Sequence, residues 1–105
     1  MNFAQRLALL PPADTVAAID LFDAQGHAVG SLANQPGQKG SVAVYAALAA
    51  LYAGCITPAA AQLGLEWYAE HVADAQAHPG KHPNIDRLLA WAQGSASYTA
   101  QITRA

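Results

Sequence analysis

The chain has 105 residues, of which 53% are hydrophobic and only 11% charged, whereas an average soluble domain carries about 25% charged residues. The formal net charge is −2, and the five basic residues are scattered along the chain. No basic stripe of the kind that follows a phosphate backbone is present, so we expect no nucleic-acid partner. The length predicts a single domain over residues 1–105.

The low charge also bears on self-association and location. Because a surface with few charges repels its own copies weakly, we expect a homo-oligomer, in the simplest case a two-fold dimer.

A lone cysteine, Cys55, excludes an internal disulfide. Together with an N-terminus whose apolar core is too short for a signal peptide, it predicts a cytoplasmic protein. The uncharged segment 42–63 is interrupted by Gly54 and Pro58, so we expect two buried helices and no membrane span.

The first elements are a short helix and a hairpin. Residues 2–10 place Phe3, Leu7 and Leu10 at helical spacing before two prolines. Two alternating segments, 15–22 and 27–33, flank the turn sequence DAQG. Gly26 suits the left-handed position of such a turn, so these segments predict a β-hairpin.

Helices follow the hairpin. Ser41 is predicted to cap a helix over 42–53, which is apolar on almost every side and belongs in the middle of the fold or under a partner subunit. Pro58 is predicted to begin the longest helix, which runs to about His78 and is stopped by Pro79-Gly80.

The last elements are a helix over 83–93, expected to bury Ile85, Leu88 and Leu89, and a tail, 97–103, that alternates with a period of two. An isolated hairpin is marginal in water, so the tail is expected to add a third strand to it. The predicted fold class is α+β: a short N-terminal helix and a small antiparallel sheet of hairpin plus C-terminal strand, covered by three helices.

The long predicted helix has two adjacent faces. One is a core face of Ala61, Leu65, Tyr68, Val72 and Ala75. The other is a stripe beside it, half accessible to solvent, that contains Trp67, His71, Asp74 and His78. Both functional hypotheses below depend on this helix being continuous and on its imidazoles being accessible.

Three of the four histidines lie in the stretch EHVADAQAHPGKHPNIDRLL, residues 70–89. Asp74 and His78 are four apart and can converge, and His82 can fold back from the PGK turn as a third metal ligand, with Glu70 or His71 in support. His71 and His78, seven apart, cannot easily share one ion. No HExxH or finger-type spacing is present.

Two other interpretations of this stretch remain open. In the first, it is a helix boundary: His78 pairs with Asp74 at the negative end of one helix, and His82 and Asn84 serve the start of the next, with Asp86 at its positive end. In the second, its histidines form a pH-sensitive contact.

A second candidate site is the loop PGQKGS, residues 36–41. Gly37, Lys39, Gly40 and Ser41 lie at a predicted helix N-terminus, where free N–H groups and a lysine can hold an anion. The loop is not a Walker A motif, because its lysine precedes the glycine. An ordinary capped loop explains it equally.

The segments GSVAVYAALAALYAG and GLEWYAEHVADAQAHPGKHPNIDRLL, with the DAQG hairpin, resemble a family of small uncharacterised bacterial proteins, a domain of unknown function. The resemblance covers nearly the whole chain, and AEHxxDAxxxPGxHPNIDRL is its most distinctive pattern. It implies a bacterial, cytosolic, single-domain protein and assigns no role to any residue.

Two functional hypotheses result. We favour a non-catalytic binding or assembly module, a homodimer that contacts a protein partner or a small ligand through the set Trp67, His71, Asp74, His78, His82 and Asn84. The alternative is a metal-binding or metal-dependent hydrolytic site on Asp74, His78 and His82. The residues assign no catalytic group and identify no cofactor.

Overall fold

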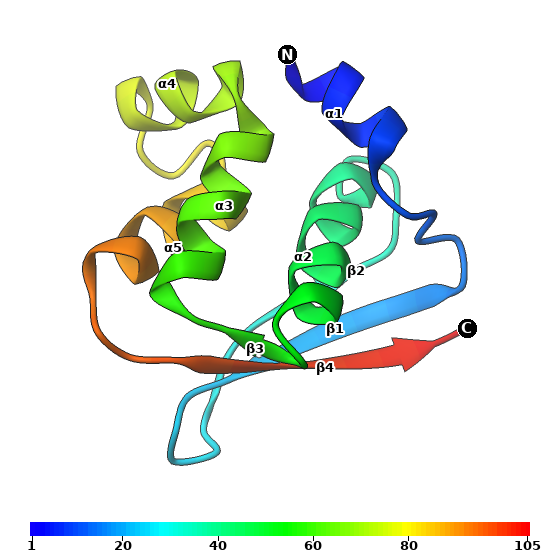
Figure 1. Cartoon of the computed structure of the whole chain (residues 1–105), viewed down its shortest axis with the longest axis vertical. Helices are drawn as coiled ribbons and strands as arrows, with labels where there is room; N and C mark the ends of the chain where they lie inside the picture. Colours follow the sequence, from blue (N-terminus) through cyan, green and yellow to red (C-terminus); the bar gives the residue numbers. More distant parts are fainter.

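Five helices lie on one face of a four-stranded antiparallel sheet in the computed structural model, which describes all 105 residues (Figure 1). This arrangement confirms the predicted α+β class. The elements are α1 (Phe3–Leu9), β1 (Val16–Phe22), β2 (Ala28–Ala33), α2 (Lys39–Leu51), β3 (Cys55–Ile56), α3 (Pro58–Tyr68), α4 (Glu70–Ala77), α5 (Pro83–Gln93) and β4 (Tyr98–Arg104).

The sheet has the order β2-β1-β4-β3, so the C-terminal strand lies beside β1 and extends the hairpin as predicted. Ile19 of β1 stands opposite Leu32 of β2 and Ile102 of β4, and this apolar row faces the helices. The two-residue strand β3, which pairs with Thr99 and Tyr98, was not predicted. Two residues are too few to show an alternation.

Helix α2 lies at the centre of the core, in agreement with its apolar sequence. Val42, Val44, Tyr45 and Leu48 are fully buried, and all the buried hydrophobic residues form one cluster. The neighbouring helices pack closely: a Cβ at Gly64 of α3 would lie 2.8 Å from Leu88 and 2.9 Å from Leu48. None of the helices combines the length and the apolar character that crossing a membrane requires.

The prediction that Ser41 caps this helix is wrong. The helix begins at Lys39 after Gln38, and no side chain caps it. Ser41 lies in the first turn, where its Oγ accepts a hydrogen bond of 2.7 Å from the Tyr68 hydroxyl. Tyr68 is buried, and a buried hydroxyl needs such a partner.

The prediction of one helix from Pro58 to His78 is also wrong, because the chain turns sharply at Ala69. This residue has φ 52° and ψ −117°, which ends α3 and starts α4 in a new direction. No proline or glycine marks the turn. The tertiary contacts on either side of it account for it: Tyr68 is buried and stacked on Phe3, and Glu70 accepts the Phe3 N–H.

The break divides the predicted histidine stripe. Trp67 lies on α3 and is buried, whereas His71 and Asp74 lie on α4, which His78 ends. The continuous accessible seam on which both hypotheses depended is therefore absent. The predicted core positions remain inside: Ala61, Tyr68 and Ala75 are buried, and Leu65 and Val72 pack against the core.

Replacing Ala69 with glycine should stabilise the protein. Glycine adopts φ 52°, ψ −117° without the clash of a Cβ, so Ala69→Gly is expected to raise the free energy of unfolding by about 1 kcal/mol. The matched control is Ala73→Gly, an exposed position inside α4, which should lower it by about 1 kcal/mol. Urea denaturation of both variants measures this, and equal destabilisation would contradict a turn at Ala69.

Candidate functional site

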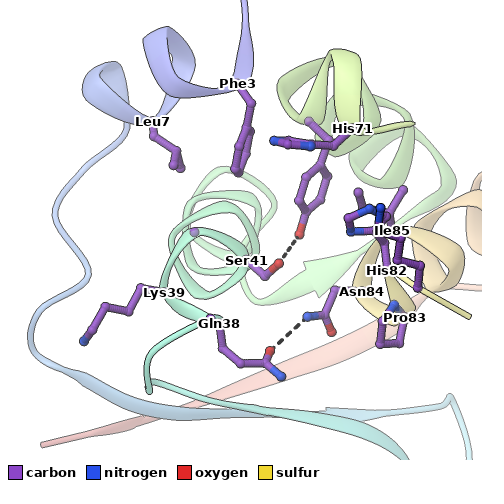
Figure 2. A pocket seen from close by; sticks show the side chains of 14 residues that line it. Phe3, Leu7, Gln38, Lys39, Ser41, His71, His82, Pro83, Asn84 and Ile85 are labelled. Atoms are coloured by element: carbon purple, nitrogen blue, oxygen red, sulfur yellow. Dashed lines mark hydrogen bonds between the residues drawn. The ribbon is translucent and has the colours of Figure 1, made fainter. Parts of the chain in front are cut away.

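A cavity of about 480 Å³ lies between α1, the first turns of α2 and α5, and the junction of α3 with α4 (Figure 2). We call it the α2–α5 cavity. Segments far apart in the sequence contribute to it, from the N-terminal helix to the start of α5. Its lining residues are Phe3, Leu7, Gly37, Gln38, Lys39, Gly40, Ser41, Tyr68, His71, Lys81, His82, Pro83, Asn84 and Ile85.

The N-termini of α2 and α5 meet at this cavity. Asn84 in the first turn of α5 donates a hydrogen bond of 3.0 Å to the Oε1 of Gln38, which precedes α2 (Figure 2). The first N–H groups of an α-helix have no partner within the helix, and no side chain caps either helix. In α2 these are the N–H groups of residues 39–41, whereas α5 contributes only the Asn84 N–H, because Pro83 has none and the Ile85 N–H donates to the His82 carbonyl.

A partly buried hydrogen-bond network fixes the start of α5. The Tyr45 hydroxyl donates to the Asn84 carbonyl at 2.6 Å, and Arg87 donates to the Asn84 side chain at 3.0 Å and to the Tyr45 hydroxyl at 3.3 Å. Burial raises the pKa of Tyr45 to about 12, so it stays a neutral donor. The network holds α5 against α2 and so keeps the cavity's shape.

One wall of the cavity is aromatic. The Phe3 ring stacks on Tyr68 with centroids 5.2 Å apart and meets His71 edge-on at 5.0 Å. The His82 ring lies 6.0 Å from the His71 ring. Figure 2 shows both imidazoles on the α4 and α5 side of the cavity, opposite the start of α2.

Behind this wall, Asp74 holds Lys81 and His82, which lie in the turn before α5. His82 Nε2 donates to Asp74 Oδ2 at 2.6 Å, and Lys81 Nζ lies 3.0 Å from the same oxygen. These hydrogen bonds lower the pKa of Asp74 to about 2. The His78 Nε2 is 3.9 Å from Asp74 Oδ1 and its side chain is 62% exposed, so the predicted Asp74–His78 pair is the weakest of these contacts.

The cavity brings together residues from both sets that the sequence singled out, the predicted anion loop and the histidine stretch. All four residues of the predicted anion loop line it, and so do three of the six from the histidine stretch: Gly37, Lys39, Gly40, Ser41, His71, His82 and Asn84. Trp67, Asp74 and His78 do not line it. Lys39 lies at the rim, where its ammonium points away from the cavity towards Asn34 Oδ1, 3.5 Å away (Figure 2).

Sequence reasoning missed the rest of the lining. Gln38 and Lys81 directly adjoin predicted residues, and treating the whole loops as candidates would have included them. Phe3 and Leu7 carry no local signal, because their place depends on long-range contacts such as the 2.9 Å hydrogen bond from the Phe3 N–H to Glu70 Oε1, across 67 positions.

The predicted metal ligands Asp74, His78 and His82 come from the same corner of the structure. In their observed arrangement no group of three or more His, Cys, Asp or Glu side chains could hold a metal ion. The Lys81 ammonium also occupies the Asp74 oxygen that His82 contacts. A metal would have to displace that cation first.

The chemistry of the cavity favours negative charge. The two helix N-termini supply partial positive charge and free N–H groups, most of them from α2. Lys81 adds an ammonium to the lining, and Asp74 accepts only one of its three donors. Phe3 and Leu7 supply an apolar patch on the opposite side. The arrangement can hold a small anion that also has an apolar part.

The protein thus has an α+β fold, with a cavity of mixed polar and aromatic lining at its helical end. The chain belongs to a family described as an uncharacterized protein conserved in bacteria, DUF2322, whose model matches residues 3–102. This confirms the resemblance seen in the sequence. No curated protein and no solved structure matches the chain.

The lowered pKa of Asp74 predicts a pH-dependent stability. Its pKa is 3.8 when unfolded and about 2 when folded, so its contribution is present above pH 4 and is lost as the pH falls towards 2. Asp74→Asn should therefore be less stable than wild type near neutral pH, and the difference should shrink in acid. Urea denaturation across this pH range measures it.

His78→Ala is the control for this experiment, because the His78 contact is long and exposed and its removal should change little. Equal stability of Asp74→Asn and wild type near neutral pH would show that the carboxylate contributes nothing.

Proposed function

We propose that this protein is a non-catalytic module that binds a small anionic ligand, a carboxylate or a phosphate ester, in the α2–α5 cavity. The observation that carries the proposal is the convergence of two uncapped helix N-termini with Lys81 and His82 on one cavity. An anion there accepts hydrogen bonds from donors that otherwise have no protein partner.

The size and walls of the cavity support a small organic ligand. Its volume of about 480 Å³ is within the range of ligand sites, roughly 300–1,000 Å³. The Phe3 and Tyr68 rings offer an apolar surface near the donors. The walls are also preformed, because Tyr45, Asn84 and Arg87 fix one helix start and the Tyr68–Ser41 hydrogen bond fixes the other.

The test is to titrate the protein with inorganic phosphate and with a panel of small aromatic and aliphatic carboxylates, and to monitor binding through the amide chemical shifts of the protein. We expect the shifts to centre on residues 38–41 and 81–85. Lys81→Gln should weaken binding about tenfold, which is about 1.4 kcal/mol. Lys39→Gln removes the same charge from an ammonium that points away and should have little effect.

Equal weakening by Lys81→Gln and Lys39→Gln would show a general charge effect and not a site. The absence of any shift at residues 38–41 would refute the proposal. The metal-binding alternative on Asp74, His78 and His82 is tested on the same samples with zinc: stoichiometric zinc that is lost in a His78→Ala, His82→Ala double variant would favour it over the anion.

We further propose that the module acts as a cytoplasmic homodimer. The low content of charge supports this proposal, and so does the outer edge of β2. The Asn34 N–H donates to the Ala17 carbonyl. Because alternate residues of an antiparallel strand point their backbone groups to opposite sides, the register then places the N–H and C=O of Ser31 on the side away from β1. The strand has no charge or proline, the usual features that block pairing at an edge.

Two β2 strands can pair antiparallel about a two-fold axis with Ser31 opposite Ser31. Ser31→Lys should then produce a monomer, because it places two like charges side by side at the axis. Ser31→Thr is the control and should leave the dimer intact. Sedimentation equilibrium measures this, and a monomeric wild type at high concentration would contradict the proposal.

A further inference from the structure

The other edge of the sheet lies next to a groove that the α2–α5 cavity does not include. The strand β3 pairs with only the first two residues of β4, and the last contact along that edge is the Ala100 N–H with the Gly54 carbonyl, at 2.8 Å. Beyond it the edge of β4 is open. Strand β1 lies on the other side of β4.

The register defines which backbone groups are unpaired there. Residues 101 and 103 pair with β1, and the Ala105 N–H donates to Thr15 on the β1 side. In an antiparallel ladder alternate residues point to opposite sides, so Ile102 and Arg104 direct their backbone N–H and C=O groups outward. About four residues of an added strand, roughly 13 Å, fit between Gly54 and the end of β4.

An apolar groove of about 310 Å³ runs beside this edge. On one side is the flank of α2, where Ala46 and Ala50 leave space that larger side chains would fill. On the other are Val16 and the side chain of Ile102. The same segment of β4 therefore offers free hydrogen-bonding groups and an apolar recess for side chains, the two elements of strand addition.

The charge of the groove indicates which partner fits it. Arg104 is the only charged residue that lines it, and one of its guanidinium nitrogens donates to Thr15 Oγ1 at 3.2 Å. Its other donors face solvent, since the residue is exposed. A second copy of this strand would bring a like charge to Arg104, whereas an acidic side chain would complement it.

We propose that the β4–α2 groove binds an extended peptide segment of a partner protein, which adds as a strand to the free edge of β4. The segment has small apolar side chains that enter the recess beside Ala46 and an acidic residue that pairs with Arg104. This site is separate from the anion cavity, so one can fail while the other stands.

The test is selection of a displayed library of random octapeptides on the full-length protein, followed by fluorescence polarisation of the enriched peptides. We expect alternating small apolar residues and an Asp or Glu. Arg104→Gln should weaken binding about fivefold and Ala46→Leu, which fills the recess, about tenfold. Addition of peptide should shift the amide signals of Ile102 and Arg104.

Two matched controls lie outside the groove. Arg6→Gln removes the same charge from α1, and Ala73→Leu adds the same side chain to an exposed position of α4, and neither should alter binding. Peptides N-methylated at the residues that face β4 should lose affinity, because strand addition needs their N–H groups.

Three results would overturn the proposal: no peptide enriched, enriched peptides that bind Arg104→Gln and Ala46→Leu as tightly as wild type, or N-methylated peptides that keep their affinity. Loss of self-association in Ala46→Leu, without any peptide binding, would assign the groove to a second copy instead. Thermal unfolding of each variant verifies that it is folded.

Discussion

The sharp turn at Ala69 determines how the helical half of this protein is arranged. A straight helix from Pro58 to His78 would carry its histidines away from the body of the molecule. The turn instead directs α4 so that it lies against α1 and the start of α5, where Phe3 contacts both Tyr68 and His71 and Glu70 accepts the Phe3 N–H. A φ of 52° is an unfavourable backbone conformation for alanine. The burial of Trp67 and Tyr68 on one side of the turn, and these contacts on the other, must outweigh the cost of this conformation.

The cavity follows from this turn and from one partly buried network of hydrogen bonds. Tyr45 and Arg87 fix Asn84, Asn84 reaches Gln38, and Tyr68 reaches Ser41. Each contact joins a helix N-terminus to another element, so both helix starts are held in place although neither has a side-chain cap. Asp74 has a supporting role: it does not line the cavity but holds Lys81 and His82, which do.

The sheet contributes differently from the helices. Its centre is closed, because β1 has a partner on each side along most of its length, and its two outer edges are unlike. The β2 edge is uncharged, whereas the β4 edge lies beside an apolar groove with a single arginine. The cavity at the helical end and these two edges are distinct surfaces, so ligand binding and protein contacts need not compete for the same residues.

The sequence by itself determined the elements whose signals are local. Prolines and glycines placed helix boundaries near 58 and 80, alternation identified β1, β2 and β4, and the uninterrupted apolar run identified the central helix. It also singled out seven of the residues that line the cavity. These features are encoded by neighbouring residues, so pattern and turn chemistry were sufficient to find them.

Tertiary structure alone decided the turn at Ala69, the short strand β3, the role of Ser41 and the joining of two predicted sites in one cavity. In each case the deciding partner is distant in the sequence: Phe3 for the turn, Tyr98 and Thr99 for β3, Tyr68 for Ser41, and Asn84 for Gln38. The physical reason is that burial and hydrogen bonding between remote segments outweigh local helix preference, which amounts to less than about 1 kcal/mol per residue for residues other than proline.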